Sequence, residues 1–96
     1  MDKAQLQTDG IAAKQRGLIF SVCRKEKRHA KWTGVLEGIA DLPSAIDQAK
    51  PIEAYEVAVF TQGPEPLGGY MYWTSRDPET LNSTLITHAI WQPTET

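Results

Sequence analysis

Three segments of this chain carry apolar side chains at every second position, and this alternation constrains the fold most. They are LIFSVCR (residues 18–24), EAYEVAVFT (residues 53–61) and YMYWTSR (residues 70–76). A fourth segment, AKWTGVLEG (residues 30–38), alternates in the same way. A period of two is typical of a β-strand with one buried face. The sequence therefore predicts at least four strands.

Alternation also assigns side chains to the faces of the sheet. In residues 18–24 Phe20 and Val22 share the buried face, and in residues 30–38 Trp32 falls on the face that we expect to be the core. The 70–76 segment has aromatic side chains on both faces, so one face is core and the other is exposed or docked on a partner. We expect a first hairpin with its turn within residues 26–29. The Pro- and Gly-rich loop QGPEPLGG (residues 62–69) connects a second.

The stretch DLPSAIDQAK (residues 41–50) predicts one short helix over residues 43–50. Proline suits the first turn of a helix, and Ser44 with Asp47 forms a capping-box pattern, while Pro51 ends the helix. One apolar stripe follows helical spacing and should pack across the sheet. Its members are Leu42, Ile46 and Ala49.

The two ends of the chain are less regular. Residues 1–16 are polar and interrupted by Gly10, so we expect a loosely ordered arm or one short helix, followed by a single domain over residues 17–96. Asp77 and Pro78 favour one helical turn, after which the β-branched residues predict a final strand over residues 84–91, with a helix there as the alternative. The predicted fold class is α+β, an antiparallel sheet of about five strands with one short helix packed on it.

The chain length of 96 residues fits one domain, and the single cysteine, Cys23, fits a reducing compartment. We find neither a secretory signal nor an apolar run long enough to span a bilayer, and we expect a cytoplasmic protein. The net charge of −2 is unevenly distributed. Residues 1–32 carry eight cations against three acids, whereas the remainder carries two cations against nine acids.

The C-terminal third, with the pattern GYMYW followed by ITHAIWQPTE, resembles the ending of a family of small phage and prophage proteins of unknown function. Those proteins end in an aromatic strand and a Thr-His-Trp-x-Pro-type segment. Here Ala89 and Ile90 separate Thr87-His88 from Trp91 and Pro93. The resemblance implies a mobile-element origin, and it implies no activity because the family has none established.

Residues suited to catalysis or to metal binding are sparse. Cys23 with His29 or His88 is the one thiol–imidazole combination, and Cys23 lies in an apolar strand, where free cysteine is usually inert. Metal-ligand spacing and a phosphate-binding glycine loop are both missing from the sequence. We expect a non-enzymatic protein with no cofactor and no metal site.

The segment RKEKRHAKW (residues 24–32) carries five cations and a tryptophan, and it is the strongest candidate for a binding surface. A solvated hairpin tip is the alternative, in which these cations point into water and contribute little to stability. We predict binding to a host protein or a protein–nucleic-acid assembly. The alternative is direct binding of RNA or single-stranded DNA, because cations with neighbouring aromatics suit phosphates and unpaired bases. The candidate partner-binding residues are Arg24, Lys25, Lys27, Arg28, Lys31, Trp32, Tyr70, Tyr72 and Trp73.

Overall fold

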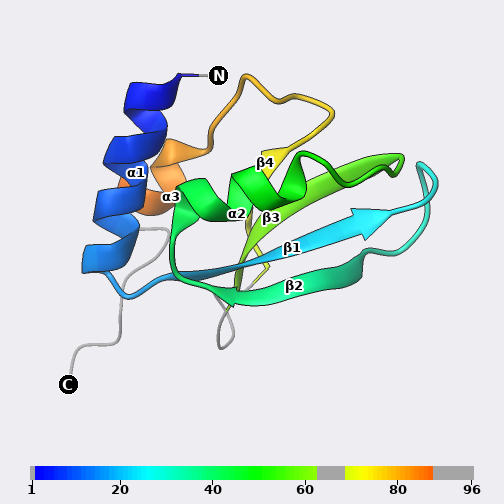
Figure 1. The fold of residues 1–96 in the computed structure, drawn as a ribbon, viewed down its shortest axis with the longest axis horizontal. Helices are drawn as coiled ribbons and strands as arrows, with labels where there is room; N and C mark the ends of the chain where they lie inside the picture. The colour runs from blue at the N-terminus through cyan, green and yellow to red at the C-terminus, as the bar shows by residue number, and fades with distance from the viewer. Residues whose placement is uncertain (1, 63–68, 88–96) are drawn as a thin grey trace.

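A computed structural model describes residues 2–62 and 69–87, which form a four-stranded antiparallel sheet with three helices (Figure 1). The α+β class is confirmed, with four strands in place of about five. In chain order the elements are α1 (Lys3–Gln15), β1 (Ile19–Lys25), β2 (Thr33–Ile39), α2 (Leu42–Ala49), β3 (Glu56–Gln62), β4 (Met71–Thr74) and α3 (Ser83–Thr87).

The strand order is β2-β1-β3-β4, and every neighbouring pair is antiparallel. The predicted hairpin of β1 and β2 is confirmed, and its turn is closed by a hydrogen bond from the Ala30 amide to the Lys27 carbonyl oxygen, 3.1 Å long. The central pair, β1 with β3, keeps an unbroken register from Ile19 opposite Gln62 to Lys25 opposite Glu56. The most regular part of the sheet is therefore also its middle.

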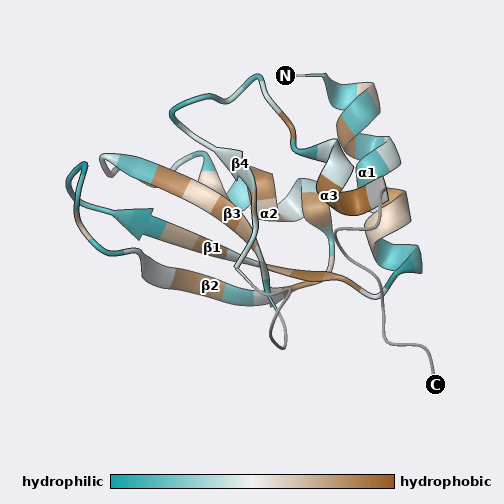
Figure 2. Ribbon diagram, turned by 180° about the vertical axis from the view of Figure 1, so that it is seen from behind, coloured by the Kyte–Doolittle hydropathy of each residue, from teal (hydrophilic) through white to brown (hydrophobic). Residues whose placement is uncertain are grey.

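The hydrophobic core lies between the helices and one face of the sheet. Phe20 and Val22 of β1 and Val57 and Val59 of β3 are fully buried there, as the alternation predicted. Seen from the opposite side, the strands lie in front of α2, and no helix of the described residues covers this second face (Figure 2). We call it the helix-free face.

A bulge in β2 reverses the face that Trp32 was predicted to occupy. Cys23 pairs with Gly34 and Val22 pairs with Leu36, so Val35 is an extra residue between two consecutive pairs. An extra residue shifts the alternation by one position. Leu36 therefore packs against the core, whereas Trp32 packs edge to face against Phe60, which faces away from the helices. The prediction of a core-facing Trp32 was wrong for this reason.

A second bulge, in β4, places two consecutive aromatic residues in the core. The register shifts between Val59, which pairs with Trp73, and Phe60, which pairs with Met71. Tyr72 and Trp73 are each only 2% exposed, and the indole nitrogen of Trp73 donates to the Pro78 carbonyl oxygen at 3.2 Å. The strict alternation predicted for residues 70–76 is broken at this point.

Of the two alternatives expected for the N-terminal segment, a loosely ordered arm or one short helix, the structure has the helix, the 13-residue α1. Asp2 caps it by accepting hydrogen bonds from the amides of Ala4 and Gln5. Leu6 and Ala13 pack into the same core as the sheet, so α1 belongs to the domain predicted for residues 17–96. Its buried face also contains Asp9 and Gly10, which is why the sequence lacks a clear apolar stripe.

Helix α2 begins one residue before the predicted start, and its cap is Asp41 instead of Ser44. The Asp41 carboxyl group accepts a hydrogen bond of 3.1 Å from the Ser44 amide, and Pro43 occupies the first turn. The predicted apolar stripe is confirmed, because Leu42, Ile46 and Ala49 are all buried.

The predicted strand over residues 84–91 is wrong for residues 84–87, which belong to helix α3; residues 88–91 lie outside the described residues. The β-branched composition is overridden by tertiary contacts. Leu85 and Ile86 are fully buried, and the Ser83 hydroxyl donates to Asp9 of α1 at 2.6 Å.

The Asp9 carboxyl group, which is fully buried, connects three elements. It accepts hydrogen bonds from the side-chain nitrogen Nε2 of Gln5 at 2.8 Å, from the Tyr72 hydroxyl at 2.6 Å and from the Ser83 hydroxyl at 2.6 Å. Burial raises the pKa of Tyr72 above its ordinary value of 10.0, and the hydrogen bond to Asp9 and the charge of Asp9 raise it further.

We predict that this hydrogen bond makes the protein sensitive to alkali. A tyrosine whose pKa is raised in the folded state ionises first in the unfolded chain, so its stabilising effect is present below about pH 10 and is lost as the pH rises further. The free energy of unfolding, measured in urea between pH 7 and 11, should fall above pH 10. Tyr72→Phe should lower stability at pH 7 by about 1–3 kcal/mol and show a smaller alkaline loss. An equal alkaline loss in both proteins would contradict this.

Candidate functional site

The helix-free face carries its own small aromatic cluster. Trp32 and Phe60 pack edge to face, with ring centroids 5.0 Å apart. Trp32 precedes Thr33, which pairs with Arg24, and Phe60 pairs with Ser21, so the contact between the rings spans β1 near Cys23. Ala58, on the same face, has no exposed surface. Trp32 is therefore a half-buried packing residue and not a free stacking platform.

Lys25 is held in place beside this cluster. Its ammonium group lies 4.8 Å from the centre of the Trp32 ring and 3.5 Å from a carboxyl oxygen of Glu56. Glu56 also accepts a hydrogen bond from the Thr74 hydroxyl. The side chains of Lys25 and Glu56 are only 17% and 12% exposed, so this is a partly buried ion pair. The expectation that all five cations point into water is wrong for Lys25.

The remaining cations lie at or near the hairpin tip. Arg24 pairs with Glu26 at 3.2 Å, and both side chains are largely exposed. Lys27, Arg28 and Lys31 are exposed and form no ion pair with any residue of the described chain. We call these three residues the cationic tip. It lies on a turn closed by its own hydrogen bond, so the charges project from an ordered support.

The structure separates the aromatic residues that were predicted to bind a partner. Tyr70 is 42% exposed, but Tyr72 and Trp73 are buried against the helices and cannot contact a partner without unfolding. Their burial removes two of the three residues proposed to extend a base-stacking surface. The physical reason is the β4 bulge, which directs both side chains to the core.

Cys23 lies on the helix-free face and is partly buried. Burial raises the pKa of the thiol, the nearby charge of Glu37 raises it further, and the hydrogen bond with Ser21 partly opposes these effects. A thiol with a raised pKa holds little thiolate at neutral pH and is a poor nucleophile. Within residues 2–62 and 69–87, no group of three or more His, Cys, Asp or Glu side chains is placed to hold a metal ion.

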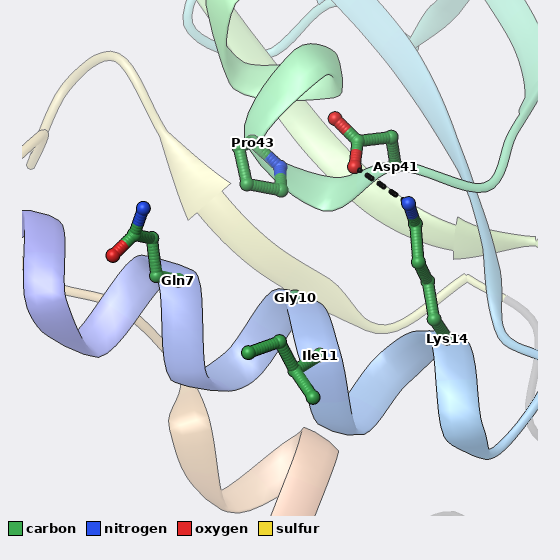
Figure 3. A pocket seen from close by; sticks show the side chains of 6 residues that line it. All are labelled: Gln7, Gly10, Ile11, Lys14, Asp41 and Pro43. Carbon is green, nitrogen blue, oxygen red and sulfur yellow. Dashed lines mark ion pairs between the residues drawn. The ribbon is translucent and has the colours of Figure 1, made fainter.

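A groove that the sequence did not predict lies between α1 and the start of α2 (Figure 3). Its volume is about 340 Å³. Next to it α1 and α2 approach closely at Gly10, where an added Cβ would lie 2.9 Å from Cδ of Pro43. Figure 3 shows Lys14 extending from α1 to Asp41, 3.2 Å away, at one end of the groove. The lining residues are Gln7, Gly10, Ile11, Lys14, Asp41 and Pro43.

No feature of the sequence had pointed to this groove. Ile11 is 61% exposed, whereas an isoleucine within a helix is expected to be buried. Without knowing that α1 is a helix and that Asp9 and Gly10 face inward, this exposure could not be anticipated.

No family model matches this chain, and no curated protein sequence or solved structure is significantly similar to it. The resemblance of the C-terminal third to small phage and prophage proteins is therefore untested. No helix in the described part of the chain has the length and apolarity needed to cross a membrane.

Replacing the half-buried Trp32 should cost less stability than replacing a fully buried tryptophan. We expect Trp32→Ala to lower the free energy of unfolding by about 1–3 kcal/mol, because it loses the contact with Phe60 and the Lys25 ammonium. Trp73→Ala is the control and should cost about 3–5 kcal/mol, since that side chain is buried on all sides. Urea denaturation measures both values. A Trp32→Ala cost as large as that of Trp73→Ala would show that Trp32 belongs to the main core.

Cys23 should react slowly with iodoacetamide at pH 8. Its raised pKa and partial burial both reduce the amount of accessible thiolate. The matched control is the double variant Cys23→Ser/Val35→Cys, which moves the one thiol to an exposed position on β2. Mass spectrometry of timed samples should show faster alkylation in the control. Equal rates would contradict the described burial of Cys23.

Proposed function

We propose that this chain is a non-enzymatic binding protein that contacts a partner through the hairpin of β1 and β2. The partner is a protein, or a protein–nucleic-acid assembly, that presents an acidic surface. The observation that supports this most is the cationic tip, whose three charges have no ion-pair partner in the described chain. Unpaired charges on an ordered turn suit electrostatic steering, because no internal ion pair has to break and the backbone of the turn is already ordered when they bind.

Side-chain contacts hold the end of β1 next to the hairpin turn. Lys25 is fixed by Glu56 and by the Trp32 ring, and Arg24 pairs with Glu26 next to the turn. The contact between Lys25 and Glu56 joins the hairpin to β3, so the tip is connected to the central strands of the sheet. Two of the five basic residues form ion pairs with carboxylates, and the other three are unpaired in the described chain. This difference favours a binding surface over a turn whose cations serve solubility alone.

A protein partner is favoured over direct binding of RNA or single-stranded DNA. Stacking of bases needs exposed aromatic faces, but Tyr72 and Trp73 are buried and Trp32 is occupied by Lys25 and Phe60. The remainder of the chain is acidic and would repel a long polyanion. The phage or prophage origin and the cytoplasmic location stay predictions from the sequence.

The test compares two variants that remove the same charge. Lys27→Ser/Lys31→Ser removes two cations from the tip, and Lys3→Ser/Lys50→Ser removes two from other exposed sites. Exposed charges contribute under about 1 kcal/mol each, so both variants should melt close to the wild type. In affinity capture from nuclease-treated lysate of the source cells, the first variant should lose the proteins that the wild type and the second variant retain.

A separate measurement addresses the alternative. Single-stranded RNA and DNA oligonucleotides labelled with a fluorophore should bind weakly, if at all, at physiological salt. Tight binding that weakens steeply with salt and is lost in the tip variant would instead support the nucleic-acid alternative. If the two variants capture the same proteins as the wild type, the cationic tip is only a solvated turn.

A further inference from the structure

We propose that His29 makes binding at the cationic tip dependent on pH, so that the affinity for an acidic partner rises as the pH falls from about 8 to about 6. This regulation rests on the proposed function, in which the tip meets a surface rich in carboxylates. A protonated imidazole adds a fourth positive charge to the three that are already unpaired in the described chain.

The position of His29 in the turn is the first observation. The hydrogen bond from the Ala30 amide to the Lys27 carbonyl oxygen closes the turn around two central residues, Arg28 and His29. His29 is exposed. Its imidazole therefore lies on the outermost part of the hairpin, among the residues that supply the unpaired charges.

The surroundings of the imidazole are the second observation. No hydrogen bond or ion pair joins the His29 side chain to another described residue, on the hairpin or on any other element. The imidazole can thus gain a proton without breaking a contact within the fold. The charged groups near it along the hairpin are Lys27, Arg28, Lys31 and the ion pair of Arg24 with Glu26.

The direction of the effect follows from the two kinds of charge that meet. An imidazole ordinarily changes its charge between about pH 8 and pH 5, whereas carboxylates ordinarily stay ionised down to about pH 4. A fall in pH through the upper part of this range therefore adds positive charge to the tip while the acidic partner stays negative. The attraction increases, because the added charge has the same sign as the rest of the tip.

Binding and protonation should also reinforce each other. Negative charges close to an imidazole favour its protonated form. An acidic partner that prefers the protonated tip must, by linkage, promote proton uptake when it binds. Since three cations are present at every pH of interest, the gain from one more is moderate, about two- to fivefold in Kd, as for a single exposed charge pair.

Binding of a rhodamine-labelled oligoglutamate peptide, followed by fluorescence anisotropy at low salt, tests this regulation. The wild type should bind about two- to fivefold more tightly at about pH 6 than at about pH 8. His29→Asn keeps a residue suited to a turn but removes the imidazole, so its affinity should be nearly the same at both values. The matched control is His88→Asn, which removes the other histidine of the chain and should retain the wild-type dependence. Equal pH dependence in the wild type and in His29→Asn would overturn the proposal.

Nuclear magnetic resonance observes the imidazole itself. The titration midpoint of the His29 ring protons, assigned by comparison with His29→Asn, should move to higher pH when the peptide is added, whereas that of His88 should stay in place. A His29 midpoint that the peptide leaves unchanged would show that bound carboxylates do not lie near the imidazole, and this would also overturn the proposal.

Failure of the proposed function would look different. At about pH 8, where an ordinary imidazole is neutral, Lys27→Ser/Lys31→Ser should still bind the peptide more weakly than Lys3→Ser/Lys50→Ser. If it does, but the wild-type affinity does not change with pH, the tip binds acidic surfaces without regulation by His29. If the two lysine variants bind equally, or the wild type does not bind at either pH, the proposed function falls and this regulation falls with it.

Discussion

The buried carboxyl group of Asp9 is the interaction on which the arrangement of the helices depends. A carboxyl group without solvent must receive hydrogen bonds, and here the donors come from α1 itself, from β4 and from the start of α3. Tyr72 can reach Asp9 only because the bulge in β4 turns it toward the helices. Ser83 is available because residues 83–87 form a short helix instead of a strand. One buried acid thus connects α1, β4 and α3.

The sequence predicted the elements in which local pattern and final environment agree. Strands β1 and β3 keep an unbroken register in the middle of the sheet, so strict alternation identified their buried faces, and α2 has an uninterrupted apolar stripe. The predictions failed where a tertiary contact reverses the local pattern. An extra residue moved Trp32 to the helix-free face, a bulge buried both Tyr72 and Trp73, and the short α3 depends on Asp9, which is 74 residues away from Ser83.

Helix α1 illustrates a different reason for failure. Its buried side includes Asp9 and Gly10, and its exposed side includes Ile11, so the usual relation between apolarity and burial is inverted at Asp9 and Ile11. Gly10 is required where α1 approaches Pro43, and Asp9 is required by the hydrogen-bond network. Each residue breaks the apolar periodicity for a reason that exists only in three dimensions. Local rules therefore left the helix as one of two alternatives and did not point to the groove beside it.

The sequence pattern placed the five basic residues on a hairpin, and the structure confirms that location. The pattern did not show which of them form ion pairs within the fold and which stay unpaired. Lys25 pairs with Glu56 and Arg24 pairs with Glu26, so of the five basic residues of the hairpin only the three of the cationic tip have charges unpaired in the described chain. This difference matters for binding. A charge that is already paired within the fold contributes little to attracting a partner, whereas the unpaired charges of the cationic tip act at long range on an acidic surface.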